Sequence, residues 1–214
     1  MNAKSDKSPK SRDKMIEATI SLMRRSGLSG AGINEIVKES GAPKGSIYYF
    51  FPEGKRQIAS EALTVYGRRG VAAWDEILSS ATEPAKKIEA LFDAISSRLE
   101  QAKYRQSCAA GAVCLDLEDD LEVLRRTIST VFSSWIEVIY KHFPIRNTER
   151  RKVFAGFVLT VIEGAFIRAR AERSSKPFSE AIVWLARIAE EEIPTRRGVH
   201  SPRLPFSDRR RKLR

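Results

Sequence analysis

Apolar residues recur at spacings of three and four along almost the whole chain, and no sustained alternation of apolar and polar residues appears. The first spacing is the period of an amphipathic α-helix, whereas alternation would indicate a β-strand. The sequence therefore predicts an all-α fold. In the first third we expect a helix from Pro9 to Gly27, a second over 33–40, a short third opened by Lys44, and a long fourth over 55–78.

The second half of the chain predicts further helices. Thr82-Glu83-Pro84 has the composition of a helix start, with proline in the first turn. The small apolar segment 108–117 predicts a brief buried helix. Asp119-Asp120 places negative charge at the start of the next helix, which the helix dipole favours, and Pro144 follows its end. The last two expected helices cover 150–173 and 177–192.

The helix expected over 150–173 is apolar around much of its circumference. Such a helix must bury more than one face, and one core in a body of this size covers only part of it. We therefore expect the last two helices to form a homodimer interface. The candidate interface residues are Phe157, Val161, Gly164, Trp184 and Ile188. The glycine would allow a close approach of two helices.

The most informative stretch is 41–55, which reads GAPKGSIYYFFPEGK. A short helix of small, hydroxylic, aromatic and basic residues follows a tight Gly-Ala-Pro turn, and a more amphipathic helix precedes that turn. Two short helices joined by a glycine-containing turn are typical of the helix-turn-helix, whose second helix enters the DNA major groove. The pattern predicts a DNA-binding protein.

The net charge of +11 is unevenly distributed. Residues 1–70 carry a net +6, residues 71–193 a net −2, and residues 194–214 a net +7. A basic head and tail on a near-neutral body fit a DNA-binding head joined to a globular body. The basic tail also supports an alternative, a protein that binds nucleic acid without sequence preference and with steep salt dependence.

The chain has no apolar run of the roughly 18–20 residues that a membrane span needs, and no signal-peptide segment. We therefore expect a cytoplasmic protein with no membrane partner. Cys108 and Cys114 are the only cysteines. On a helix this separation of six places the Cα atoms about 9–10 Å apart, beyond the roughly 7 Å limit for a disulfide. A thiol-based redox sensor that uses both cysteines remains an alternative.

The head resembles the TetR family of bacterial repressors. The resemblance rests on 33–55, INEIVKESGAPKGSIYYFFPEGK, where a helix ends at Gly41 and the triplet Ser46-Ile47-Tyr48 precedes Phe51-Pro52 and Lys55. The segments CAAGAVCLD and IEGAFIRARAERSSKPF resemble the LmrA/YxaF-like branch. The chain departs from the family pattern at the start of the second helix, where threonines are replaced by Ala31 and Gly32, and a small residue is replaced by Val37.

The resemblance implies a helix-turn-helix domain over 9–55 and a helical effector-binding and dimerisation domain over 56–193, followed by a basic tail, 194–214, that we expect to be disordered. The DNA-contacting residues that we expect are Lys44, Gly45, Ser46, Tyr48, Tyr49 and Lys55. Lysine can donate to guanine and serine to base or phosphate, while glycine permits close backbone approach. By resemblance, Tyr48 donates its hydroxyl to a phosphate. Ile47 and Phe51 are expected in the core of the head.

Four aromatic residues lie on the apolar stripes of three successive expected helices: Trp74, Phe92, Phe132 and Trp135. They either fill the core or line a cavity between helices that accepts a flat or hydrophobic effector. The long helix over 55–78 joins head and body, so it is the expected lever between effector and DNA. Gly67 and Gly70 interrupt it and predict a bend.

No nucleophile-base pair, phosphate loop or paired-carboxylate site is evident, and two histidines with two scattered cysteines make no convincing zinc site. The sequence thus predicts neither an enzyme nor a cofactor or metal. The function that fits best is a homodimeric transcriptional repressor. It would bind a pseudo-palindromic double-stranded DNA operator and be released by a small-molecule effector.

Overall fold

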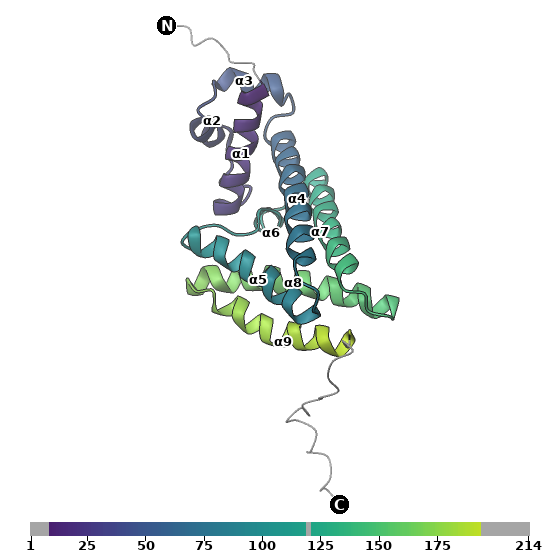
Figure 1. The fold of residues 1–214 in the computed structure, drawn as a ribbon. Coiled ribbons are helices and arrows are strands. Elements are labelled where there is room, and N and C mark those ends of the chain that lie inside the picture. The colour runs from purple at the N-terminus through teal and green to yellow at the C-terminus, as the bar shows by residue number, and fades with distance from the viewer. Residues whose placement is uncertain (1–8, 119–120, 194–214) are drawn as a thin grey trace, which may run out of the picture.

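The computed structural model describes residues 9–118 and 121–193, and the regular elements within these ranges are all α-helices (Figure 1). The all-α prediction is confirmed. The helices are α1 (Pro9–Ser26), α2 (Ile33–Ser40), α3 (Lys44–Phe50), α4 (Lys55–Ser79), α5 (Pro84–Gln101), α6 (Ala109–Cys114), α7 (Glu122–His142), α8 (Thr148–Glu172) and α9 (Lys176–Glu192). Asp119-Asp120 and the tail 194–214 lie outside the described residues, so the expectations for them stay predictions.

Helices α1, α2 and α3 form a small head at one end of the molecule (Figure 1). Gly41 ends α2 in the left-handed conformation, with φ 66°, and its N–H donates to the carbonyl of Val37. Glycine adopts this conformation without the steric cost that other residues incur, which explains the turn at this position. Ile47 and Phe51 are completely buried, so their predicted place in the core of the head is confirmed.

Ion pairs connect α1 to its neighbours. Arg12 pairs with Glu61 of α4, and its guanidinium lies 5.3 Å from the centre of the Phe51 ring. Arg25 pairs with Glu39 of α2. Partly exposed pairs of this kind contribute about 0–1 kcal/mol each, so the buried apolar core stabilises the head far more than they do.

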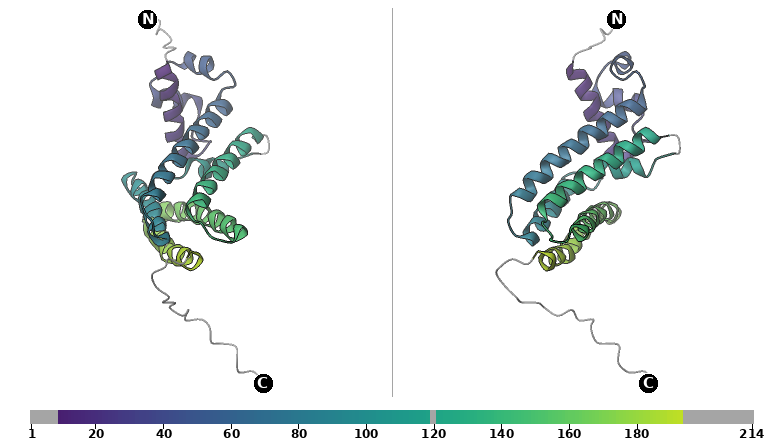
Figure 2. Two further views of the ribbon diagram at one scale, coloured as in Figure 1. Left: turned by 45° about the vertical axis from the view of Figure 1, so that its right-hand side comes forward. Right: turned by 90° about the vertical axis from the view of Figure 1, so that its right-hand side faces the viewer.

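Helix α4 runs from the head through the body, and α7 lies alongside it (Figure 2). Helix α4 continues without a break through Gly67 and Gly70, and the bend expected there stays a prediction. The two glycines allow α7 to approach α4 closely. A Cβ atom on Gly67 would lie 2.7 Å from Val131 Cγ2, and one on Gly70 would lie 2.5 Å from Trp135 Nε1. The Trp135 indole N–H donates to the Gly67 carbonyl over 3.0 Å.

The lower part of the body is built from α5, α8 and α9 (Figure 2). Phe178 of α9 lies between Phe92 of α5, at a ring-centre distance of 6.1 Å, and Phe166 of α8, at 5.5 Å. Helix α8 begins two residues earlier than predicted, because the Asn147 side chain accepts the Arg150 N–H over 2.9 Å and caps its first turn.

The short helix α6 lies between the end of α1 and the rest of the body (Figure 1). Cys108 caps its first turn, with Sγ accepting the Gly111 N–H over 3.4 Å. Among the described residues, no helix has the length and apolar character needed to cross a membrane.

Candidate DNA-binding face and effector cavity

The outer face of α3 carries most of the predicted DNA-contacting residues. Lys44 and Gly45 are exposed in its first turn, and Tyr48 and Tyr49 each expose 56 % of their surface. A Cβ atom on Gly45 would meet nothing within 4 Å, so the glycine is not required by packing inside the head. Large aromatic side chains normally bury most of their area, so two adjacent exposed tyrosines make this face a candidate surface for a partner.

The structure differs from the sequence prediction at Ser46. Its side chain is completely buried, so in this conformation the hydroxyl does not reach a base edge or a phosphate. The physical reason is its place beside Ile47 on the side of α3 that packs into the head, where a small residue fits. The Ser46 backbone N–H donates to the Pro43 carbonyl over 2.9 Å and so helps to form the first turn.

Lys55 is the first residue of α4 and is half-buried. The preceding Gly54 has φ 66° and ψ −134°, a conformation that favours glycine. The Gln57 side chain accepts the Glu53 N–H over 3.1 Å, which satisfies one donor at this helix start. Lys55 therefore projects from an ordered helix N-terminus close to the end of α3.

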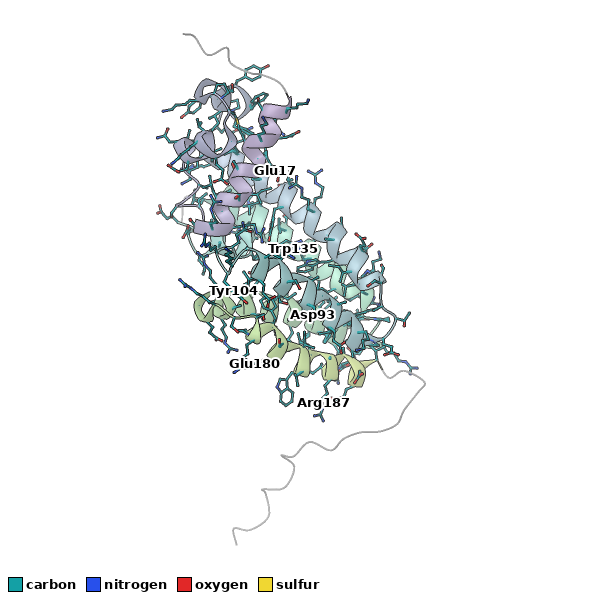
Figure 3. All side chains as sticks on the ribbon, turned by 60° about the vertical axis from the view of Figure 1, so that its left-hand side comes forward. Glu17, Asp93, Tyr104, Trp135, Glu180 and Arg187 are labelled. Atoms are coloured by element: carbon teal, nitrogen blue, oxygen red, sulfur yellow. The ribbon has the colours of Figure 1, made fainter. Side chains whose placement is uncertain are left out.

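Below the head, a cavity of about 280 Å³ lies between helices of the body and α1. Trp74 and Trp135 line it, at a ring-centre distance of 5.0 Å from each other. The Tyr66 ring stands edge-on to Trp135 at 5.8 Å, and Phe166 of α8 completes the aromatic wall. In Figure 3 Trp135 lies in the interior of the body, whereas Glu180 and Arg187 lie at the outer surface of α9.

The other two predicted effector residues do not line this cavity. Phe92 is completely buried and packs on Phe178, so it belongs to the core between α5 and α9. Phe132 is half-buried and lies beside Trp135, at a ring-centre distance of 6.0 Å, outside the lining. An amphipathic stripe predicts burial equally well for a core residue and a cavity residue, which is why the sequence did not separate them.

Polar side chains also line the cavity, and of these only Cys108 was a candidate from the sequence. Arg69 pairs with Glu17 of α1. Arg24 donates to the Ser107 carbonyl over 3.2 Å, and Arg98 of α5 is exposed. Cys108 and Glu163 complete the polar part of the lining. Burial raises the pKa of the Cys108 thiol well above its usual range, with a further contribution from Glu163.

The two cysteines differ in their surroundings. Cys108 is buried, Cys114 is exposed, and both are free thiols. Because the thiolate is the reactive form, the raised pKa of Cys108 disfavours oxidation at neutral pH. The geometry therefore does not favour the alternative of a redox sensor that uses both cysteines.

Hydrogen bonds to backbone groups join the end of α1 and the turn after it to the body beside the cavity. The Ser107 N–H donates to the Arg24 carbonyl over 2.8 Å, and the Arg170 guanidinium donates to the Arg25 carbonyl over 2.6 Å. The Ser29 N–H donates to Asp116 Oδ2 over 3.0 Å. The head thus contacts the body through α1 as well as through α4, and Arg24 belongs to both this joint and the cavity wall.

An apolar surface covers α8 and α9 on the side away from the core. Phe157 exposes 47 % and Trp184 60 % of their area, Val161 and Ile188 are half-buried, and Gly164 is exposed with open space around it. Further exposed apolar residues on the same helices are Val153, Ile167 and Val183. The spacing of three and four between these α8 residues was a signal that could have found Val153 and Ile167.

Comparisons with known proteins agree with this arrangement. Residues 15–62 match the family described as bacterial regulatory proteins of the tetR family, and residues 84–182 match the C-terminal domain of LmrA/YxaF-like transcriptional regulators. The HTH-type transcriptional regulator LmrA of Bacillus subtilis is 31 % identical over 174 residues, which cover 78 % of this chain and 90 % of LmrA. YxaF of the same organism is 28 % identical, over 78 % of this chain and 88 % of its own.

Solved structures show the same fold. The regulatory protein TetR from Rhodobacter sphaeroides superposes with a TM-score of 0.74 at 20 % identity, covering 83 % of this chain and 97 % of its own. The reduced form of NemR from E. coli gives a TM-score of 0.70 at 19 % identity, over 83 % and 97 %. The chain belongs to the TetR family of helix-turn-helix transcriptional regulators, in its LmrA/YxaF-like branch.

Proposed function

We propose that this protein is a homodimeric transcriptional repressor that binds a pseudo-palindromic operator and is released from it by a small, hydrophobic or aromatic effector. The observation that carries the proposal is the exposed face of α3, which presents a lysine, a glycine and two tyrosines on a head that is otherwise well packed. A relative from Mycobacterium sp. GP1, 22 % identical over 88 % of this chain and 95 % of its own, is named the transcriptional repressor DhaR.

On DNA, α3 would lie in the major groove. Lys44 would donate to guanine O6 and N7, and Gly45 would let the backbone approach the bases. Tyr48 would donate to a phosphate, and Tyr49 would contact a thymine methyl group or the backbone. Lys55 would bind a phosphate together with the N-terminus of α4.

Two copies are needed to read a palindrome. The apolar surface of α8 and α9 supports a dimer in which these helices pack against the same helices of a second copy. Such a dimer would place its two α3 helices in successive major grooves, roughly 34–36 Å apart. An effector in the cavity would favour a different separation and so release the DNA.

Helix α4 is the proposed lever, because it carries Lys55 at the DNA end and Trp74 in the cavity wall. The joint between α1 and the body offers a second connection, since Arg24 lies at both the joint and the cavity. A ligand that displaces this side chain would disturb the end of α1.

The first test is selection of bound sites from a random DNA library at physiological salt. Enrichment of an inverted repeat is the expected result, and it would provide the probe for an effector screen. Binding without enrichment, which fades steadily as salt rises, would favour the alternative of non-specific nucleic-acid binding.

The second test is Gly164→Arg, which places a charge in the proposed interface, with Ser97→Arg on the exposed side of α5 as the matched control. We expect sedimentation to give monomers and much weaker operator binding for the first variant only. A Gly164→Arg dimer with unchanged mass would reject this interface.

A further inference from the structure

A second cleft, with a volume of about 690 Å³, lies at the surface of the body where α5 and α8 end. This basic cleft is lined by Glu100, Lys103, Tyr104, Arg105, Arg170 and Arg173. It shares no lining residue with the cavity between the body and α1. In Figure 3 its aromatic residue, Tyr104, lies at the edge of the body.

The basic cleft carries a positive charge that its surroundings do not balance. Four of its six lining residues are cations and one is an anion. Within residues 9–118 and 121–193, none of these four cations forms an ion pair with a carboxylate. Glu172, which precedes Arg173 in the chain, is paired with Arg168 instead. The net charge of the lining is therefore open to an anion from outside.

Helix dipoles account for only part of this charge. Helices α5 and α8 both end at the cleft, and cations near a helix C-terminus are stabilised there. Each C-terminus carries roughly −0.5 of an elementary charge, so two of them offset about one of the cations. Most of the positive charge has no such explanation.

The cations are attached to an ordered backbone. Lys103, Tyr104 and Arg173 have φ values of 50°, 56° and 48°, and in the described part of the chain they are the non-glycine residues with positive φ. The Tyr104 N–H donates to the Leu99 carbonyl over 2.9 Å, which fixes the turn after α5. Strained conformations of this kind persist only where the surrounding structure holds them, and they concentrate at functional sites.

Arg170 is held in place by the head. Its Nη2 donates to the carbonyl of Arg25, in the last turn of α1, over 2.6 Å. A guanidinium has five N–H donors, so Nε and Nη1 remain for a ligand while this bond is kept. A side chain that is already fixed loses less conformational entropy when a ligand binds.

The residue types indicate the class of ligand. The planar fork of an arginine matches two oxygens of a phosphate group, and three arginines with a lysine supply more charge than one phosphate group needs. We infer that the basic cleft binds a polyphosphate anion, either the inorganic ion or the phosphate chain of a nucleotide. The inference goes beyond the proposed function, because it requires neither operator DNA nor the effector cavity.

Calorimetric titration of the full chain with tripolyphosphate at physiological salt tests the site. Arg105→Gln combined with Arg173→Gln removes two cations and leaves the bond between Arg170 and Arg25 intact. We expect this double variant to bind tripolyphosphate about tenfold more weakly or worse, because charge-assisted hydrogen bonds are lost.

The matched control is Arg68→Gln combined with Arg146→Gln. Both residues are exposed, one on α4 and the other between α7 and α8, and the double variant loses the same net charge. Salt screens distant charges, so its affinity should change by less than about twofold. The basic head and the tail 194–214 are unchanged in both double variants, so their general attraction for anions cancels in the comparison.

Arg170→Lys provides a second test, because it keeps the charge but removes the fork. It should weaken tripolyphosphate binding several-fold, and unchanged affinity would overturn the role of Arg170.

Further probes define the ligand. Pyrophosphate should bind more tightly than citrate, which carries a similar charge on carboxylates, and ATP should bind more tightly than AMP. ATP that binds more tightly than tripolyphosphate would assign the nucleoside to the site as well, whereas equal affinities would assign the phosphate chain alone.

Three results would overturn the inference. Equal losses of tripolyphosphate affinity in the two double variants would show a general effect of net charge. Citrate binding as tight as that of pyrophosphate would reject the phosphate class. Weaker binding of duplex DNA by the cleft variant alone would assign the cleft to DNA phosphates. The proposed function is tested separately by library selection, and its failure would leave the tripolyphosphate titrations unaffected.

Discussion

The face of α3 and the cavity of the body use aromatic residues in opposite ways. Tyr48 and Tyr49 come from one turn of one helix and expose more than half of their area. Trp74 and Trp135 come from two helices, expose 7 % and 3 %, and lie among Cys108 and residues from α1, α5 and α8 as well. Exposed aromatics contribute little to folding, whereas buried ones stabilise the fold and shape the cavity.

Replacing an aromatic residue in each region tests this contrast most strongly. Trp135→Ala should lower the free energy of unfolding by about 3–5 kcal/mol, because it removes a buried indole and its hydrogen bond to the Gly67 carbonyl. Tyr49→Ala should change it by no more than about 0.5 kcal/mol while weakening operator binding. Denaturant titration and DNA-binding assays measure the two effects. Similar losses of stability in both variants would contradict the contrast.

The buried carboxyl group of Glu163 predicts that the stability of the folded protein depends on pH. The pKa of Glu163 is raised to about 7 in the folded state, above its ordinary value of about 4.3. The folded protein therefore favours the protonated form, and its stabilising contribution is complete below about pH 4. This contribution is lost as pH rises from about 4 through about 7 and amounts to about 3–4 kcal/mol.

Glu163→Gln should remove this dependence, so that the variant gains most stability over the wild type at pH 8 and least at pH 5. Denaturant titrations at the two pH values measure it, with Glu76→Gln on the exposed surface of α4 as the control. A gain of equal size at both pH values would show that Glu163 is not the group responsible.

Alanine substitutions of one glycine in the body and one in α3 extend the comparison of the two regions. Gly70→Ala should destabilise the fold by about 1–3 kcal/mol, because the new Cβ would lie 2.5 Å from Trp135 Nε1 and force α7 away. Gly45→Ala has open space and should stabilise α3 by up to about 1 kcal/mol, yet weaken DNA binding by holding the backbone away from the bases. Thermal melts and operator titrations separate the outcomes, and a stable Gly70→Ala protein would show that α7 adjusts easily.

Replacing Lys44 and replacing Lys55 should affect DNA binding in different ways. Lys44→Ala should cost about 1–3 kcal/mol of operator binding and relax the base preference at one position. Lys55→Ala should weaken all DNA sequences alike and reduce the slope of binding against salt by about 1. Repeating the library selection and the salt titration with each variant measures both effects. An unchanged base preference for Lys44→Ala would place that lysine on a phosphate.

Much of the head could be predicted because its information is local. The turn at Gly41, the burial of Ile47 and Phe51, and the exposure of Tyr48 and Tyr49 follow from residues close together in the chain. The exception is Ser46, which its hydroxyl and its place at the start of the recognition helix suggested as a DNA contact. Its burial depends on how closely α3 packs against the other head helices.

The sequence by itself determined that the chain is helical and where most helices begin and end, and it predicted that α3 contacts DNA, because periodicity, capping and turn chemistry act over a few residues. Only the tertiary structure decided which buried residues line the cavity. It separated Trp74 and Trp135 from Phe92 and Phe132, and it gave Gly67 and Gly70 a packing role. Glu163 is the one charged residue in the stretch 153–167. Its unpaired oxygen depends on how α8 packs against other helices, and helix periodicity carries no information on that packing.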